Sequence, residues 1–246
     1  MEFTSYLDQV RLQAVALRAA AVAAGPDADV PTCPDWDVRR LVRHIARVHN
    51  WVVHALDTDP AGSSPSSPDK PPEGWDDLLT WWDSAFEDMV AGIERLGPDG
   101  PAWTFDSSGT AGFWARRQAH ENAIHRLDAE HALAGSRDAA AVPSLVFEPD
   151  FAADGVDEAM IMIGRRMSEE RSDAAGTVLF HAADAGRAWL VTLKPGAAPE
   201  IGPAEVIDAD ASVVGTADAV YRAAWRRPST AVVGGDRAVI DALRTP

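Results

Sequence analysis

Four segments in the first half of the chain repeat apolar residues at helical spacing, and this pattern constrains the fold more than any other feature. Apolar residues three and four positions apart indicate a helix with one face turned to the core. The expected faces are Tyr6, Val10, Leu12, Val15 and Leu17 in the first helix, Leu41, His44, Ile45, Val48, Trp51, Val52 and Ala55 in the second, and the apolar residues of 75–96 and 111–134 in the third and fourth. Four such helices predict a bundle, in which metal sites form from inward side chains on facing helices.

Glycine and capping residues separate these helices. Gly25 follows the first helix, and Gly97 and Gly135 follow the third and fourth, where glycine readily ends a helix. Asp37 stands where its carboxylate can accept a hydrogen bond from the first free amides of the second helix. The segment 57–74 is rich in Pro, Ser and Asp, so we expect an exposed loop that can border a pocket.

Beyond Gly135 the pattern changes from helical spacing to the alternation typical of strands. One further helix is expected at 151–167. The expected strands are 177–181, 187–193, 211–214 and 230–233, with a helix from Thr216 to Trp225 and a terminal helix from Asp236. The sequence therefore predicts two domains, an α-helical bundle over 1–150 and a small α+β domain over 151–246 that begins with a linking helix.

Composition narrows the classes of partner. A net charge of −16 argues against nucleic acid and anionic membranes as partners, because both require clustered Lys and Arg. No apolar run approaches the roughly 18 residues of a membrane span, and the N-terminus lacks the pattern of a secretory signal. The single cysteine, Cys33, excludes an internal disulfide and fits a reducing cytoplasm. We expect a cytoplasmic monomer or weak homodimer.

Three side chains on two of the expected helices can converge on one point. Glu121 and His125 are four residues apart, so both project from one face of a helix. His44 belongs to the apolar stripe of the second helix and is therefore expected to point inward. Two imidazoles and one carboxylate form a ligand set of catalytic zinc sites, which leave one coordination position open. This pattern predicts a divalent-metal site within the bundle.

Other interpretations of these residues stay open. A glutamate and a histidine four apart are common on solvated helix faces, and His44 can also be a core imidazole that hydrogen-bonds Glu121 without a metal. Asp128 lies one turn after His125, where it can either orient that imidazole or form a surface ion pair. Cys33 is more typical of a small buried hydrophobe than of a reactive thiol.

Three segments carry a resemblance to a known family. They are 33–44 (CPDWDVRRLVRH), 116–130 (RRQAHENAIHRLDAE) and 154–158 (DGVDE). All three are similar to signatures of the mycothiol-dependent maleylpyruvate isomerase family. The resemblance covers nearly the whole chain and implies a DinB-like four-helix metal-binding domain followed by a smaller, sterol-carrier-like α+β domain.

The resemblance also implies roles for individual residues. His44, Glu121 and His125 match the family's divalent-metal ligands, usually of zinc, and mycothiol is the thiol cosubstrate. A metal-bound thiol has a lowered pKa and presents a nucleophilic thiolate to a small electrophile, which leads to isomerisation or to thiol transfer. Arg227, with Arg226 as second choice, matches the family's catalytic arginine from the second domain, which can hold a substrate carboxylate.

Two classes of rival function, other enzymes and a protein without catalysis, share this ligand set. A zinc-bound water could support hydrolysis, and two histidines with one carboxylate also describe an open non-haem iron site. A metal-binding or sensor protein without catalysis could retain the same scaffold. The residues of the site do not distinguish among these functions.

Overall fold

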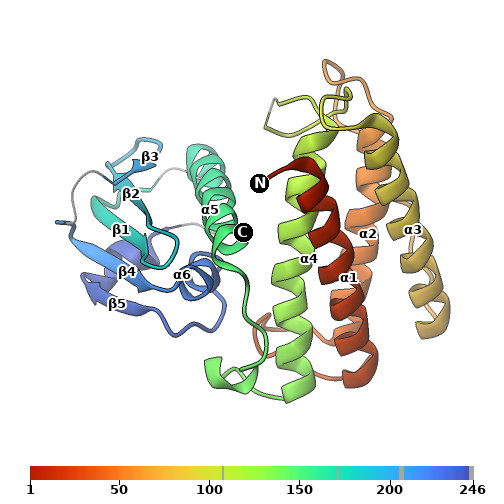
Figure 1. Ribbon diagram of the computed structural model, residues 1–246, viewed down its shortest axis with the longest axis horizontal. Coiled ribbons are helices and arrows are strands. Elements are labelled where there is room, and N and C mark those ends of the chain that lie inside the picture. The colour runs from red at the N-terminus through yellow and green to blue at the C-terminus, as the bar shows by residue number, and fades with distance from the viewer. Residues whose placement is uncertain (107, 171, 205–207, 244–246) are drawn as a thin grey trace. The chain divides into compact units, whose positions relative to one another are not determined.

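The structure, a computed structural model, describes residues 1–106, 108–170, 172–204 and 208–243. The chain divides into two compact units, Met1–Arg137 and Asp138–Pro246, coloured red to green and green to blue in Figure 1. The sequence pattern places the domain boundary at residue 150, and the contacts place the segment 138–150 in the second unit. The expected fold class, a helical domain followed by a small α+β domain, is confirmed.

The first unit contains four long helices (Figure 1). They are α1 (Phe3–Ala24), α2 (Val38–Leu56), α3 (Trp75–Leu96) and α4 (Ala111–Ala134). Helix α1 packs chiefly on α4, α2 packs chiefly on α3, and α2 also contacts α4. The Asp37 carboxylate accepts a hydrogen bond of 2.7 Å from the amide of Arg40, which caps α2 as expected. Gly135 follows α4 in the left-handed conformation, with φ of 60°.

The predicted buried face of α1 is wrong at two positions. Leu12 and Val15 are exposed, with 55% and 67% of their surface accessible. The buried face instead consists of Tyr6, Leu7, Val10, Gln13, Ala14, Leu17, Ala20 and Ala21. This helix is rich in alanine, so apolar residues occur on all of its sides. Which side is buried is decided by the packing of its small residues against α4.

The second unit combines helices with a mixed sheet. Its elements are a short 3₁₀ turn at Ala139–Ala141, α5 (Pro149–Glu169), β1 (Gly176–Ala182), β2 (Arg187–Leu193), β3 (Glu200–Pro203), β4 (Ala211–Gly215), α6 (Ala217–Ala224), β5 (Val232–Gly235) and α7 (Arg237–Asp241). The strand order is β3-β2-β1-β4-β5, with β1 parallel to β4 and the other neighbours antiparallel. Strand β3 was not predicted, because this short edge strand contains Gly202 and Pro203, which are unfavourable in strands.

Close packing of α5 on α6 anchors the helical side of this unit. Gly155 of α5 lies against the ring of Tyr221 of α6, which is fully buried. The indole nitrogen of Trp225 donates a hydrogen bond of 3.0 Å to the carbonyl oxygen of Gly155. Among the described residues, no helix combines the length and the apolarity needed to cross a membrane.

Candidate metal centre

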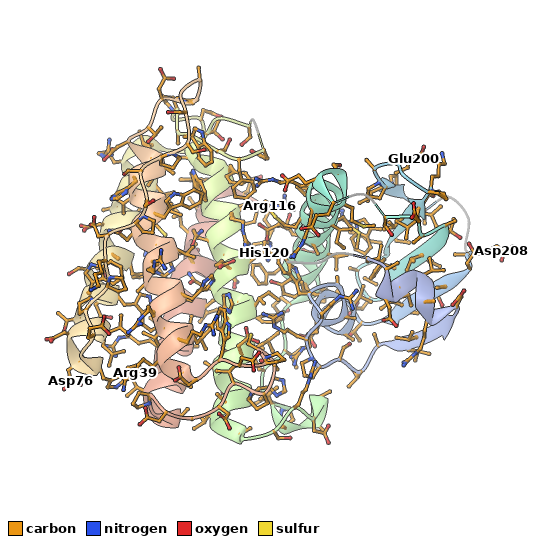
Figure 2. All side chains as sticks on the ribbon, turned by 180° about the vertical axis from the view of Figure 1, so that it is seen from behind. Arg39, Asp76, Arg116, His120, Glu200 and Asp208 are labelled. Carbon is orange, nitrogen blue, oxygen red and sulfur yellow. The ribbon has the colours of Figure 1, made fainter. Side chains whose placement is uncertain are left out.

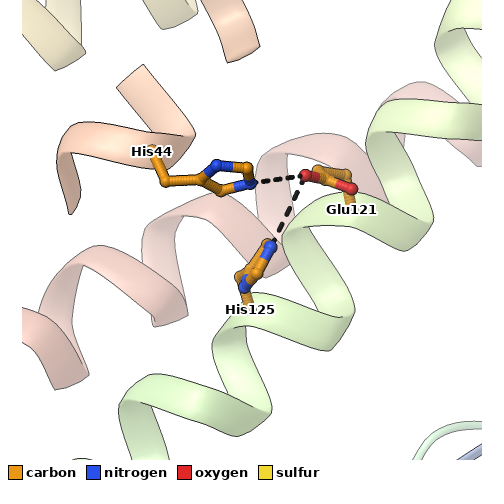
Figure 3. Close-up of side chains that lie close together, drawn as sticks. All are labelled: His44, Glu121 and His125. Carbon is orange, nitrogen blue, oxygen red and sulfur yellow. Dashed lines mark hydrogen bonds and ion pairs between the residues drawn. The ribbon is translucent and has the colours of Figure 1, made fainter. Parts of the chain in front are cut away.

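Helices α2 and α4 bring His44, Glu121 and His125 together (Figure 3). The candidate ligand atoms of the three residues all lie within 4.8 Å of one another. Nε2 of His44 is 3.2 Å from Oε1 of Glu121, and Nε2 of His125 is 3.5 Å from the same oxygen. The predicted convergence of these side chains is therefore present in the structure.

The three side chains differ in their access to solvent. Those of Glu121 and His125 are each only 10% exposed, whereas that of His44 is 37% exposed. The ring planes of the two histidines meet edge to face, with centroids 4.9 Å apart. Trp36 stacks on His125 with an interplanar angle of 12° and shields that ring. The cluster is thus closed on the α4 side and open beside His44.

Arg117 keeps the Glu121 carboxylate ionised. One turn earlier on α4, its guanidinium forms an ion pair with the second carboxylate oxygen, Oε2. Burial by itself raises the pKa of Glu121, but the charge of Arg117 and hydrogen bonds with His125 and His44 hold that pKa well below its usual range. A metal ligand must be deprotonated, and this carboxylate meets that condition.

Asp128 orients the imidazole of His125. Its Oδ2 lies 2.8 Å from Nδ1 of His125, and its Oδ1 accepts a hydrogen bond of 2.5 Å from the hydroxyl of Thr32. Asp128 is fully buried, so the alternative of a surface ion pair is wrong. With the proton of the neutral ring on Nδ1, the lone pair of Nε2 faces Glu121. Carboxylate–histidine pairs of this kind orient metal ligands in zinc sites.

The donor set fits a divalent cation. Two imidazole nitrogens and a carboxylate oxygen direct lone pairs at one small volume, which is unfavourable unless a proton or a cation lies between them. Burial lowers the pKa of His125, but hydrogen bonds with Asp128 and Glu121 outweigh it and raise that pKa to about 8. In the metal-free protein a proton on His125 therefore supplies the positive charge that a metal would supply instead.

Removing the charge of Asp128 tests its orienting role. In an Asp128→Asn variant the amide can no longer stabilise a positively polarised imidazole, so we expect zinc to bind about 10- to 100-fold more weakly. Competition with a chromophoric chelator measures this affinity. Glu130→Gln, on the same helix but outside the cluster, is the matched control and should leave zinc affinity unchanged. Equal affinities in both variants would show that Asp128 has no such role.

A pocket of about 800 Å³ opens beside His44. The residues that line it are Asp35, Trp36, Asp37, Arg39, Arg40, Arg43, His44, Arg47, Val48, Trp51 and Pro68. Most of them belong to α2, and Pro68 belongs to the loop 57–74, which therefore borders the pocket. Arg39 lies near the start of α2 (Figure 2). The pocket gives a small molecule access to the exposed edge of the histidine–glutamate cluster.

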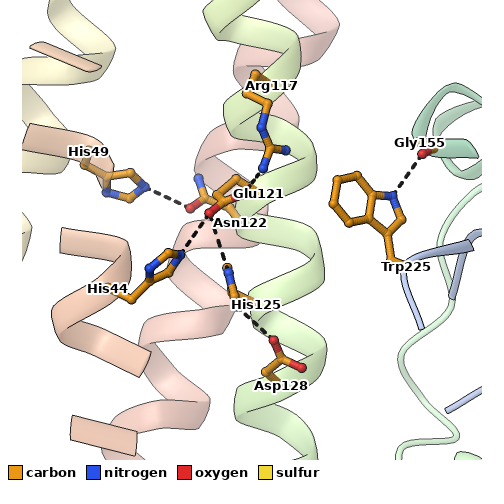
Figure 4. A network of polar contacts seen from close by, with 9 residues as sticks. All are labelled: His44, His49, Arg117, Glu121, Asn122, His125, Asp128, Gly155 and Trp225. Carbon is orange, nitrogen blue, oxygen red and sulfur yellow. Dashed lines mark hydrogen bonds and ion pairs between the residues drawn. The ribbon is translucent and has the colours of Figure 1, made fainter. Parts of the chain in front are cut away.

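A buried polar network beside the cluster was not predicted (Figure 4). His49 is fully buried, its Nε2 lies 2.9 Å from Oδ1 of Asn122, and its Nδ1 accepts a hydrogen bond of 3.1 Å from the indole of Trp82. These two contacts require the neutral ring with its proton on Nε2. Because Asn122 follows Glu121 directly, the network fixes α4 against α2 and α3 at the level of the candidate ligands.

Protonation of His49 should destabilise the first unit. Burial lowers its pKa from 6.5 to about 4, more than the hydrogen bond with Asn122 raises it. The unfolded chain therefore binds a proton between pH 6.5 and 4 that the folded chain does not bind, so stability falls as pH falls through this window. The loss approaches about 3 kcal/mol at pH 4, at 1.36 kcal/mol per pKa unit. Denaturant unfolding at pH 7 and pH 4 measures it. Between pH 7 and pH 4, a His49→Gln variant, which keeps a donor and an acceptor, should lose less unfolding free energy than the unmodified protein, by about that amount. Equal losses in the two proteins would contradict this role of His49.

The remaining candidate residues lie as follows. Cys33 is half-buried against the core of the first unit, as expected for a small hydrophobe. His120 is fully buried on α4 (Figure 2). Arg226 donates hydrogen bonds to the carbonyl oxygens of Ile240, Asp241 and Leu243, so its guanidinium caps the end of α7. Arg227 is half-buried and donates to the carbonyl oxygen of Trp225 at 2.8 Å; its assignment as the catalytic arginine stays a prediction.

Comparisons with known proteins agree on one family. The family model described as the mycothiol maleylpyruvate isomerase N-terminal domain matches residues 7–130, and the one described as the MDMPI C-terminal domain matches residues 150–242. The crystal structure of the mycothiol-dependent maleylpyruvate isomerase resembles this fold with a TM-score of 0.63 at 12% identity, over 95% of this chain and 93% of that chain. The crystal structure of a histidine-to-alanine mutant of that enzyme gives 0.63 at 11% identity, over the same shares. At these identities the likeness concerns the fold alone. No curated protein matches the sequence.

Proposed function

Since the chain belongs to the mycothiol maleylpyruvate isomerase family, with both domains of that family matched, we propose that it is a metal-dependent enzyme that uses mycothiol. The proposed reaction is isomerisation of a small electrophile or transfer of the thiol to it. Zinc is the proposed metal, because two histidines, one carboxylate and an open position are typical of catalytic zinc sites. A reducing cytoplasm is the proposed compartment, because a free thiol persists there.

The observation that carries this proposal is the geometry of the histidine–glutamate cluster. His44, Glu121 and His125 offer three ligand atoms within 4.8 Å of one another, and no fourth protein ligand is among them in the described part of the chain. Structural zinc sites have four protein ligands, so a set of three supports a catalytic role with one position for an exogenous ligand. When bound, the metal would lower the pKa of a thiol ligand and so supply a thiolate at neutral pH.

The residues around the cluster support this chemistry in three ways. Arg117 keeps Glu121 ionised, and Asp128 keeps Nε2 of His125 available as a ligand. Trp36 excludes water from one face of the His125 ring. The pocket beside His44, at about 800 Å³, has room for a thiol or an electrophile to approach from the side that the protein leaves open. Isomerisation and transfer both begin from the same thiolate, and these residues serve either outcome.

An activity assay tests this proposal. We expect the zinc-loaded protein to convert maleylpyruvate, or to couple mycothiol to a chromogenic electrophile such as 1-chloro-2,4-dinitrobenzene, only when both the thiol and the metal are present. Turnover without thiol would instead favour hydrolysis, and turnover that requires iron and oxygen would favour a non-haem iron enzyme. Metal binding without any turnover would favour the metal-binding or sensor alternative.

A further inference from the structure

A stripe of arginines runs along the outer face of α2 and lines the pocket beside His44. Arg40, Arg43 and Arg47 are three and four residues apart, so they lie above one another on this face. The chain as a whole carries a net charge of −16, so a pocket lined by four arginines differs in charge from the chain as a whole. A local positive field of this kind favours anionic ligands.

Two of these arginines have guanidinium nitrogens available for a ligand. Arg47 forms no hydrogen bond and no ion pair with any described residue. Arg43 meets only the exposed Glu73, at 3.4 Å through Nη2. A guanidinium has five N–H donors, so Arg43 and Arg47 can both donate to a carboxylate or phosphate oxygen in the pocket.

The other two arginines of the pocket have partners in the protein. Arg39 pairs with Asp27 at 3.5 Å and lies over the ring of Trp75. Arg40 donates to the carbonyl oxygen of Asp35 and lies over the ring of Trp36. The Asp37 carboxylate caps α2, and both acidic residues stand at its N-terminal end, away from Arg47. The available positive charge is therefore concentrated at Arg43 and Arg47.

The pocket continues from these arginines onto an apolar surface. One turn further along α2 lie Val48 and Trp51, which line the pocket together with Pro68 of the loop. Edge-to-face contacts with Trp103 and Trp114, at centroid distances of 5.7 and 5.6 Å, hold Trp51 in place. A rigid aromatic side chain beside two arginines fits a ligand that has an anionic group at one end and a planar apolar body.

We propose that this pocket binds an organic carboxylate with a planar, aromatic body. Its carboxylate lies on Arg43 and Arg47, and its body lies on Val48 and Trp51. His44 lines the same pocket, so this ligand would lie beside the candidate metal centre. The binding of the carboxylate does not rest on the proposed function.

Calorimetric titration of the metal-free protein with 2-naphthoate tests the binding site directly. We expect 2-naphthoate to bind and its neutral analogue 2-naphthamide to bind at least about tenfold more weakly, since the amide has no negative charge for the two arginines. Arg43→Gln and Arg47→Gln should each weaken 2-naphthoate by about tenfold, and Arg47→Lys by less. Arg95→Gln is the matched control, because it removes an exposed arginine of α3 that pairs with Asp57. It should leave the affinity for 2-naphthoate unchanged.

Three outcomes would overturn this site: equal affinity for the acid and the amide, no effect of the two arginine variants, or binding of inorganic phosphate in place of 2-naphthoate. Circular dichroism of each variant establishes that the helices are intact. Zinc affinity, measured separately, tells the two proposals apart. A protein that binds 2-naphthoate through Arg43 and Arg47 but takes up no zinc would retain the carboxylate site and lose the proposed enzymatic function.

Discussion

Replacing Glu121 by alanine is expected to remove the metal from the protein and abolish thiol-dependent activity. Glu121 is the only carboxylate among the candidate ligands in the described part of the chain, and its Oε1 is the atom that both His44 and His125 approach. Two neutral imidazoles alone neither neutralise nor fix a divalent cation. Zinc affinity should therefore fall by more than about 100-fold, the upper end of what loss of an outer partner costs.

Folding has to be separated from binding in this experiment, because Glu121 also pairs with Arg117, whose side chain is only 12% exposed. Breaking a buried ion pair costs about 3–5 kcal/mol. A His125→Ala variant leaves that pair intact and should lose zinc as well. Glu130→Ala, a half-buried position on α4, should keep the metal content of the unmodified protein. Metal analysis with circular dichroism measures these results, and full zinc retention in both ligand variants would exclude this cluster as the site.

A methyl group at Gly155 is expected to destabilise the second unit strongly. A Cβ atom there would overlap the ring carbons Cε2, Cδ2 and Cζ of Tyr221, which is fully buried and cannot swing into solvent. Overpacking of a core costs about 1–3 kcal/mol and occasionally more, and here α5 and α6 would also have to separate. We expect Gly155→Ala to lose about 3 kcal/mol of unfolding free energy.

Gly164 provides a control on the same helix. A Cβ atom at Gly164 would meet its nearest neighbour, Cδ1 of Ile201, at 3.5 Å, an ordinary van der Waals contact. Because alanine has the higher helix propensity, Gly164→Ala should be neutral or more stable by up to about 1 kcal/mol. Thermal unfolding of the two variants measures the difference. Equal melting temperatures would mean that the contact between α5 and α6 is looser than the structure describes.

The helical pattern of the sequence was sufficient to predict that His44, Glu121 and His125 converge, but not what surrounds them. Glu121 and His125 share a face because they are four residues apart, and Asp128 follows by the same geometry. The apolar stripe of α2 predicted that His44 points inward, and the structure turns it toward Glu121 but leaves its side chain 37% exposed at the pocket. The neighbours of His49 could not be predicted, because Asn122 and Trp82 come from two other helices whose register depends on side-chain packing.

Other differences between prediction and structure also have physical causes. The face of α1 depends on which alanines pack against α4, and hydrophobic periodicity is weak in an alanine-rich helix. The arginines of α2 lie outside the apolar face that the sequence predicts for this helix. In the structure these arginines line a pocket, which the loop residue Pro68 and the ring of Trp51, packed against Trp114, complete. Such pockets arise from contacts between segments distant in the chain.

We propose that the His44, Glu121 and His125 cluster holds a metal that binds and activates a thiol. Replacing zinc by cobalt gives a visible spectrum that reports on the ligands, and titration with mycothiol tests the claim directly. We expect a new sulfur-to-cobalt charge-transfer band that saturates at one thiol per metal and is absent from the Glu121→Ala variant. A cobalt spectrum that does not change on adding thiol would contradict the account, because the metal would then have no position for the thiol it is proposed to activate.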